Sequence, residues 1–483
     1  MNTTVADDGE DDVSSITGQY LARYRGLTTG AGAPALLPVT GAQRRFALVR
    51  ALDPTGRPDL VPMFFAFPRG TVDPSRLAAA ARRLVSLHPV LRGRPAVVRG
   101  TPVLRRAEPE VPVVRVRPRP GEDAGAALRR VLGAWSPDGP PLRLFLTEDA
   151  PEGGREHSVL PHGGGPSEVL AVVLDHLACD GRTLARIVEE LGAAYAEGPR
   201  ARPPAPGEVA AELAAYRDAV LLQLDAEERA ESPGALAYWG ERLRAVRDRA
   251  PAARHGLPTA GTLPTGSTPV PPTDSTPVPP TGSASVLPTG SASVVLPGSA
   301  AGAPFPDLLD ACRSAVRVLY GPGHTVPLGY PWGGRPPGAE DVLGCFLNTV
   351  VFPAVTDPAP TGSEATADAW WEDLDRADVP FDAVVRAARE AGSGWSGRLD
   401  GLLTVDDGAQ RPSLRLAGVE GREVHVDGRP VRGPFAVSVT HGRELRLRMV
   451  WDRAVTADRT ALAAFDALTE ALRAKAQASP AIG

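Results

Sequence analysis

The sequence has almost no lysine and very little cysteine. Lys475 is the single lysine in 483 residues, so the positive charge is carried almost entirely by arginine. This leaves almost no scope for catalysis through a lysine Schiff base. The three cysteines, Cys179, Cys312 and Cys345, are far apart, odd in number and not spaced as metal ligands. We therefore expect neither a disulfide framework of the secreted kind nor a metal site.

Strong positive charge and long apolar runs are also missing. The 52 basic residues against 57 acidic ones give a formal net charge of −5, so nothing points to nucleic acid or to an acidic membrane surface. No run approaches the ~20 apolar residues that a membrane-spanning helix needs. The first residues, MNTTVADDGEDDVSS, lack the charged and apolar regions of a signal peptide. These absences predict a soluble, cytoplasmic protein.

Strand-like and helix-like segments are mixed along the whole chain, which predicts an α/β (α+β) protein. Residues 1–36 are polar and glycine-rich, and we expect a mobile leader there, with room for one short helix. Residues 37–200 are expected to form a first lobe, 201–256 a helical crossover, and 294–483 a second lobe. Because the two halves are similar in size and content, the sequence predicts a site in the cleft between two lobes.

Residues 257–293 differ in composition from the rest of the chain. PTGSTPV, PTDSTPV and two copies of PTGSASV begin at positions 264, 272, 280 and 288. Each unit offers about one valine to bury, which is too little to offset the entropy lost on ordering it. The composition is typical of an extended linker or surface loop, and a functional tether stays an alternative.

His176 is the best candidate for chemistry. It lies in VLDHLACDGRTL, at the end of an apolar strand and just before a helix. Asp180 can cap that helix, and Gly181 lets the backbone approach a ligand closely. The free amides of the first helical turn suit a developing oxyanion. From this pattern alone, a packed structural histidine is the alternative.

The segment DHLACDG resembles the HHxxxDG motif shared by nonribosomal peptide synthetase condensation domains and chloramphenicol-acetyltransferase-like acyltransferases. Five further segments resemble that family in the same order: LLPVTGAQRRFAL, LAAAARRLVSLHPVLRGR, ALAYWGERL, GYPWGGRPPGAEDVLGCFLNTVVF and RADVPFDAVVRAA. The resemblance covers about residues 37–475, leaving out the repeats. It implies a V-shaped pseudo-dimer of two chloramphenicol-acetyltransferase-like lobes with a central tunnel.

The resemblance also implies roles for single residues. His176 would position or deprotonate the attacking amine or hydroxyl, and a neutral imidazole is available at cytosolic pH. Asp180 would be structural and would pair with Arg92, which matches the arginine of the family's LRT segment. Gly181 would keep the tunnel open where the acyl thioester passes.

Asp175 stands where the family motif has its first histidine. Consecutive strand residues point to opposite faces, so Asp175 is expected to face away from the atoms that His176 meets. We interpret it as a tolerated change, and a degenerating site is the alternative, because a buried carboxylate needs a partner. Asn348 and Thr349 match the family's Asn-Thr pair and are expected to shape the cleft. The family's late RDxSRNPL segment has no clear match, which leaves the acceptor type open.

Taken together, the resemblance implies a free-standing condensation enzyme of natural-product (antibiotic) biosynthesis. It would transfer an acyl group from the phosphopantetheine thioester of an acyl- or peptidyl-carrier protein, met in trans, to an amine or hydroxyl. No bound metal or redox cofactor is expected. Two alternatives stay open: an acyl-CoA-dependent acyltransferase of the same fold, and a catalytically silent, condensation-like docking protein.

Overall fold

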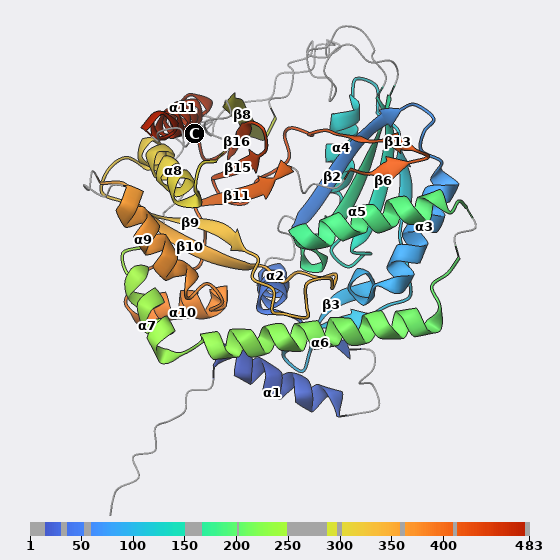
Figure 1. Ribbon diagram of the computed structural model, residues 1–483, viewed down its shortest axis with the longest axis horizontal. Helices are drawn as coiled ribbons and strands as arrows, with labels where there is room; N and C mark the ends of the chain where they lie inside the picture. The colour runs from blue at the N-terminus through green and yellow to red at the C-terminus, as the bar shows by residue number, and fades with distance from the viewer. Residues whose placement is uncertain are drawn as a thin grey trace, which may run out of the picture.

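The computed structural model describes residues 15–29, 36–52, 59–149, 167–199, 202–248, 287–296, 302–357, 363–408 and 413–478. Within these ranges helices and strands are mixed throughout, which confirms the predicted α/β class. Two large sheets, each with its own helices, form two lobes that lie side by side above one long helix (Figure 1).

The N-terminal lobe is built on a five-stranded sheet. In spatial order its strands are β14 (Arg422–Glu423), β2 (Leu60–Pro68), β7 (Ser167–Asp175), β6 (Leu142–Asp149) and β5 (Val113–Val116). All nine residues of β7 are buried, as is typical of a strand that reads as an almost unbroken apolar run. Residues 170, 172 and 174 belong to one apolar cluster, whereas 169, 171 and 173 belong to another, so both faces of β7 are covered.

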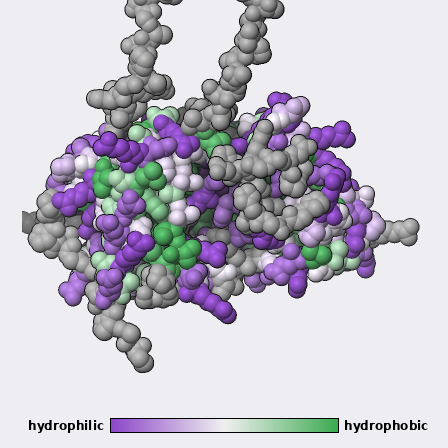
Figure 2. All heavy atoms as spheres, turned by 90° about the horizontal axis from the view of Figure 1, so that it is seen from above, coloured by the Kyte–Doolittle hydropathy of each residue, from purple (hydrophilic) through white to green (hydrophobic). Residues whose placement is uncertain are grey.

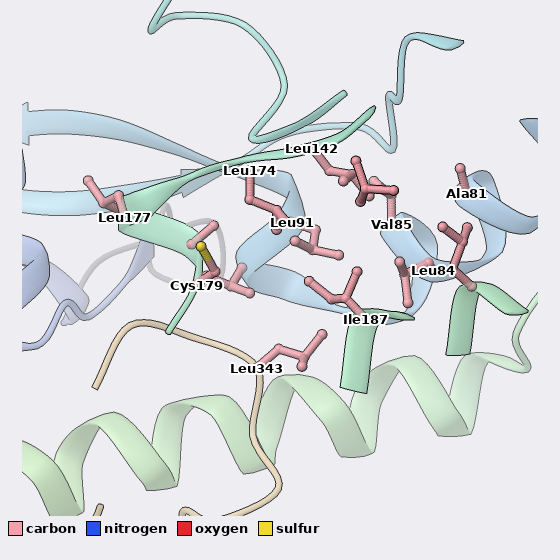
Figure 3. Packing of buried hydrophobic residues seen from close by; sticks show 14 of the residues in the cluster. Ala81, Leu84, Val85, Leu91, Leu142, Leu174, Leu177, Cys179, Ile187 and Leu343 are labelled. Atoms are coloured by element: carbon pink, nitrogen blue, oxygen red, sulfur yellow. The ribbon is translucent and has the colours of Figure 1, made fainter. Parts of the chain in front are cut away.

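Helices cover the two faces of this sheet. The first cluster includes side chains of α3 (Pro74–Leu87) and α5 (Gly181–Ala196), and the second includes those of α4 (Ala124–Gly133). A short helical turn and a small sheet complete the lobe: η2 (Pro89–Arg92), β1 (Leu36–Leu37), β4 (Thr101–Arg106) and β3 (Gly93–Val98). Figure 3 shows the first cluster, in which Leu343 from the C-terminal half of the chain joins Ile187 of α5.

The C-terminal lobe is built on a six-stranded sheet. In spatial order its strands are β10 (Asn348–Val355), β9 (Thr325–Trp332), β11 (Gly401–Asp407), β15 (Phe435–His441), β16 (Leu445–Asp452) and β8 (Thr289–Leu296). Its helices are α8 (Phe305–Tyr320), α9 (Ser363–Leu374), α10 (Phe381–Glu390) and α11 (Asp458–Ala478). Viewed from above, the outer surface is largely hydrophilic with small, separate hydrophobic clusters (Figure 2), because both cores turn their apolar side chains inward.

Strand β8 corrects the boundary expected for the repeat segment. The linker was expected to run to residue 293, but Thr289–Leu296 pair antiparallel with β16 from Asp452 to Leu445. A ladder of backbone hydrogen bonds orders this edge strand. Leu296 is its one fully buried apolar side chain. A side chain at Gly290 would collide with the Trp451 ring, so the small residues of the last repeat suit the strand. The earlier repeats lie outside the described residues.

The two lobes share parts of the chain. Strand β14 comes from the C-terminal half but pairs with β2 in the N-terminal sheet. It follows a small hairpin of β12 (Arg415–Leu416) and β13 (Val419–Glu420). The long helix α6 (Pro206–Ala230) runs beneath both lobes and leads into α7 (Pro233–Arg242) (Figure 1).

Helix α1 (Ile16–Thr28) corrects the expectation of a mobile leader over residues 1–36. Its side chains Tyr20, Leu21 and Tyr24 are buried in the N-terminal core, so amphipathic burial holds it in place. The backbone amides of Ile16 and Thr17 donate to the Glu231 carboxylate at 2.9 and 3.0 Å. The other residues of the expected leader, except Ser15, Thr29 and Leu36, lie outside the described part of the chain.

A buried histidine ties three helices of the N-terminal lobe together. His88, which ends α3, has its Nε2 at 2.6 Å from Glu190 of α5 and its Nδ1 at 3.2 Å from Glu212 of α6. Arg186 pairs with both carboxylates at 2.6 and 2.8 Å. Burial alone would lower the pKa of His88, but the hydrogen bonds and charges of Glu190 and Glu212 raise it above its ordinary value. The imidazolium form is therefore the stabilised one.

We expect His88→Gln to destabilise the protein more at pH 6 than at pH 9. Because the folded pKa is raised, this histidine contributes its full stabilisation below its unfolded pKa of about 6.5 and loses it as pH rises through the higher folded value. The expected pH-dependent part is roughly 2 kcal/mol, as for hydrogen bonds to charged groups. Urea unfolding at both pH values measures it, with the exposed His324→Gln as control. An equal loss of stability at the two pH values would contradict the prediction.

Candidate active site

A cavity of about 1040 Å³ lies between the two lobes. The N-terminal lobe contributes α2 (Gly41–Leu52), the end of β2 nearest His176, and the turn between β7 and α5. The C-terminal lobe contributes the start of β10, β11 and the loop before β15. The lining side chains on which the chemistry depends are Arg45, Phe46, His176, Asn348, Thr349 and Arg432.

The local sequence places His176 directly after the end of a strand. β7 ends at Asp175, and His176–Ala178 form the single turn η3 before α5 begins at Gly181. The His176 backbone amide donates to the Asp59 carbonyl at 2.9 Å, which continues the pairing of β7 with β2 by one residue. Asp180 caps α5 by accepting a hydrogen bond from the Thr183 amide at 2.9 Å, as its type and position predict.

The environment of His176 keeps its ring neutral. The imidazole stacks on Phe46 with ring centroids 4.8 Å apart, and within the described chain its Nδ1 has no hydrogen-bond partner. Burial, and after it the positive charge of Arg432, lower the pKa of His176 to about 4. The neutral ring expected from the sequence is therefore favoured more strongly than in a histidine with an ordinary pKa.

Asp175 is next to His176 in sequence but does not line the cavity. Its Oδ2 lies 2.7 Å from Arg50 of α2, and its Oδ1 accepts a hydrogen bond from the Leu177 amide at 3.0 Å. Burial raises the pKa of Asp175, whereas Arg50 lowers it. The carboxylate at the family's first histidine position therefore has the partner that its burial demands.

The structure corrects the expected partner of Asp180. Arg335, not Arg92, binds this carboxylate: its Nη2 lies 2.6 Å from Oδ1 and 2.5 Å from Oδ2. Both side chains are almost fully buried, at 3 and 4% exposure. Arg92 instead ends η2 near Arg106, and its Nε and Nη2 have no partner within the described chain. The sequence signal for the true partner is the Gly-Arg pair in PWGGRPPG, which carried part of the resemblance.

Arg335 belongs to a loop that docks onto the N-terminal lobe. Its Nη1 donates to the carbonyls of Ala339 and Val342 at 2.9 and 2.5 Å, so the guanidinium also holds the loop itself in shape. The Thr183 hydroxyl donates to the Gly344 carbonyl at 2.7 Å and accepts from the Gly344 amide at 3.0 Å. The loop thereby ties the C-terminal lobe to the first turn of the helix that follows His176.

The other residues singled out from the sequence also line the cavity. A side chain at Gly181 would meet no atom within 4 Å and would project into open space. Asn348 donates from Nδ2 to the carbonyls of Ala377 and Val379 at 2.7 and 2.6 Å, so it stabilises the cavity wall. The Thr349 hydroxyl faces Arg45.

Two arginines of the cavity were not singled out from the sequence. Arg45 donates from Nη1 to the Thr349 hydroxyl at 3.0 Å, and its guanidinium lies 3.6 Å from the centre of the Phe381 ring. Arg432 pairs with Asp59 and lies 4.8 Å from the centre of the Phe46 ring. With nearly all of the 52 basic residues being arginine, nothing in the sequence distinguishes these two from the rest.

Other kinds of site have little support in the described residues. No three His, Cys, Asp or Glu side chains gather there as metal ligands would. All three cysteines are buried and unpaired. No helix in the described ranges is long and apolar enough to cross a membrane.

Substitution of the Asp180–Arg335 pair is expected to be costly. Removing one partner of a buried ion pair leaves the other charge uncompensated, so Arg335→Gln and Asp180→Asn are each expected to cost about 3–5 kcal/mol of unfolding free energy. Arg92→Gln is the matched control and is expected to cost less than about 1 kcal/mol, because this guanidinium lacks a partner to lose. Urea denaturation of the three variants and of the Asp180/Arg335 double variant measures the coupling. Equal losses in Arg92→Gln and Arg335→Gln would contradict the pairing.

The pKa of His176 is expected to respond to Arg432. Arg432→Gln removes a positive charge that depresses this pKa and frees Asp59, whose charge acts in the opposite direction. The pKa of His176 should therefore rise above its value of about 4. Nuclear magnetic resonance titration of labelled histidine measures the change. Arg69→Gln, which removes a surface arginine paired with Glu148, is the control and should leave the titration unchanged. A fall in the pKa of His176 in Arg432→Gln would contradict the assignment.

The chain is similar to known proteins in sequence and in fold. No family model matches the chain. A curated relative, a probable non-canonical nonribosomal peptide synthetase named CymA from Salinispora arenicola (strain CNS-205), is 27% identical over 422 residues, which cover 81% of this chain. The chain spans 5% of that relative's length.

Solved structures share the whole two-lobed architecture. The X-domain from teicoplanin biosynthesis, which has also been solved in complex with OxyB, superimposes with a TM-score of 0.62 at 18% identity, over 91% of this chain and 95% of its own. The starter condensation domain of rhizomide synthetase, in complex with C8-CoA, gives a TM-score of 0.61 at 15% identity, over 92% of this chain and 95% of its own. The chain has the condensation-domain fold of two chloramphenicol-acetyltransferase-like lobes, and its sequence is similar to nonribosomal peptide synthetases.

Proposed function

We propose that the protein is a condensation-type acyltransferase that forms an amide or an ester. The observation that carries this proposal is the position of His176, whose neutral ring lines a cavity bounded by both lobes. A neutral imidazole can accept a proton from an attacking amine or hydroxyl. The cavity volume lies at the upper end of that of small-molecule sites and leaves room for two substrates to meet.

In the proposed reaction, the nitrogen or oxygen of the acceptor attacks the carbonyl carbon of a thioester. The new C–N or C–O bond forms as the C–S bond breaks, and the acceptor's proton passes through His176 to the leaving thiolate. Gly181 and the N-terminal end of α5 lie on the cavity wall, where the positive end of the helix dipole favours the developing oxyanion. Holding both substrates in the cavity supplies the remaining acceleration.

The acyl donor is proposed to be the phosphopantetheine thioester of an acyl- or peptidyl-carrier protein. Similarity to a nonribosomal peptide synthetase supports a place in peptide natural-product biosynthesis, where such carriers hold the intermediates. CoA is the alternative donor, since the similar starter condensation domain was solved with C8-CoA. Neither donor requires a metal or a redox cofactor for the chemistry proposed.

Docking without catalysis is the second candidate function. Two observations favour it: Asp175 replaces the first histidine of the motif, and a similar structure is an X-domain that has been solved in complex with OxyB. With either function, Asp175 has an ion-pair partner in Arg50. The partner in this case would be a synthetase or a tailoring protein, held on the outer surface of the lobes.

His176→Ala is expected to lower the rate of acyl transfer by about 10²–10⁴-fold, the usual contribution of a general base. Carrier proteins loaded with different acyl groups, and the same acyl groups on CoA, would be incubated with a pool of amines and alcohols. Intact-protein mass spectrometry would follow loss of the acyl group, and chromatography would detect the amide or ester. The exposed His324→Ala is the control and should keep full activity.

The same experiment separates the candidates. Transfer from CoA without any carrier protein would identify the CoA-dependent enzyme. Product formed equally by wild type and His176→Ala would overturn the assigned base. Carrier binding without any product from the wild type would leave a docking protein.

A further inference from the structure

The cavity wall beside His176 carries two guanidinium groups from different lobes. Arg45 comes from α2 of the N-terminal lobe, and Arg432 from the loop before β15 of the C-terminal lobe. Burial lowers the pKa of Arg45 to about 10, and the charge of Arg432 is the next largest cause. Both cations line the same cavity, and an anion bound there would offset the repulsion between them.

Aromatic rings hold both guanidinium groups and leave N–H donors free. Arg45 lies over Phe381 and uses one hydrogen bond, to the Thr349 hydroxyl. In the described part of the chain no carboxylate lies within ion-pair distance of Arg45. Arg432 lies over Phe46 and pairs with Asp59, yet 41% of its side chain remains exposed to the cavity. Each guanidinium has five N–H donors, so both can bind a further acceptor.

Carboxylates of both lobes lie around this pair, and the cavity lining also holds Arg398, Asp400, Asp406 and Asp452. Asp59 offsets Arg432, and nothing offsets Arg45 at contact distance. The two other carboxylates nearest His176 have arginine partners of their own, as Asp180 has Arg335 and Asp175 has Arg50. Asp59 and, less strongly, Asp382 of α10 act on Arg45 without contacting it, and Asp382 also interacts with Arg44.

We propose that Arg45 and Arg432 form a binding site for a carboxylate group of one of the two substrates, next to the reacting atoms at His176. The proposal rests on the proposed acyl transfer and adds the chemical class of its substrate. In the described chain no carboxylate contacts Arg45, and a carboxylate is the group with which a guanidinium forms its strong, charge-assisted hydrogen bonds. Two planar guanidinium groups, one from each lobe, offer N–H donors of the kind that bind carboxylate oxygens.

The position of the site also links substrate binding to the base. Phe46 contacts both the Arg432 guanidinium and the His176 ring, each at 4.8 Å. A carboxylate on Arg432 would offset the positive charge that disfavours protonation of His176. The base would thus gain proton affinity when the acidic substrate is in place.

The carboxylate has two chemical sources, and paired substrates distinguish them. For the acceptor, free amino acids would be compared with their carboxamides. For the donor, an ω-carboxyacyl thioester would be compared with its ω-carboxamide. The wild type is expected to prefer the acid over the amide by at least about tenfold in kcat/KM on one of the two sides, as loss of a charge-assisted hydrogen bond implies.

The arginine variants test the assignment. Arg432→Gln and Arg45→Gln should bring the acid-to-amide ratio to within about threefold of one, Arg432→Lys should retain part of the preference, and the surface control Arg69→Gln should keep it. Equal use of acid and amide on both sides, with product still formed, would overturn the carboxylate site and leave the proposed acyl transfer intact. An acid preference that survives in both Gln variants would overturn the role of the two arginines.

Direct binding provides a test that does not depend on turnover. Acetate is the probe, and the resonances of labelled His176 report on it. A saturable shift with acetate, together with a rise in the pKa of His176, is expected in the wild type and not in Arg432→Gln. No saturable response in the wild type up to about 0.1 M acetate would overturn the site. If acetate binds but no substrate pair reacts, the proposed acyl transfer fails while the anion site stands.

Discussion

The ion pair between Asp180 and Arg335 is the interaction on which the site depends. It joins the cap of the helix after His176 to a loop from the other half of the chain, with both charges nearly excluded from solvent. A buried pair of this kind is costly to break, because either charge alone would be left without water or a partner. The loop it holds also carries Leu343 into the N-terminal core and leads directly into Asn348 and Thr349. The pair therefore positions both the start of α5 and the loop before β10, and residues of both regions line the cavity.

Next to this ion pair, the environment of His176 disfavours the charged form of its ring. Burial and the nearby Arg432 both disfavour the imidazolium form. A base of low proton affinity is weak on its own and gains strength when negative charge arrives beside it. The carboxylate proposed to bind at Arg45 and Arg432 would supply such a charge. Asp175 lies next to His176 in sequence, but its charge is already paired with that of Arg50.

The sharing of chain between the lobes gives the cavity its rigidity. α6 underlies both lobes, α1 is held to its C-terminal end through Glu231, and β14 crosses from the C-terminal half to extend the N-terminal sheet. Glu227 near the end of α6 accepts a hydrogen bond from the Gly41 amide and pairs with Arg44, which fixes the start of α2 and hence Arg45 and Phe46. Residues that line the cavity are in this way tied to elements far from them in sequence.

The amino-acid sequence by itself determined the features that depend on neighbours along the chain. The apolar run of β7, the cap at Asp180 and the position of His176 at a strand end follow from residue type and spacing, and the motif resemblance pointed to the fold. Tertiary structure alone decided the pairing of charges. The resemblance implied Arg92 as the partner of Asp180, whereas the docking of a loop 155 residues away makes Arg335 the partner. Arg45 and Arg432 are two arginines among many until the two lobes close around one cavity. Coulombic partnership depends on distance and burial in three dimensions, and neither is written in local sequence.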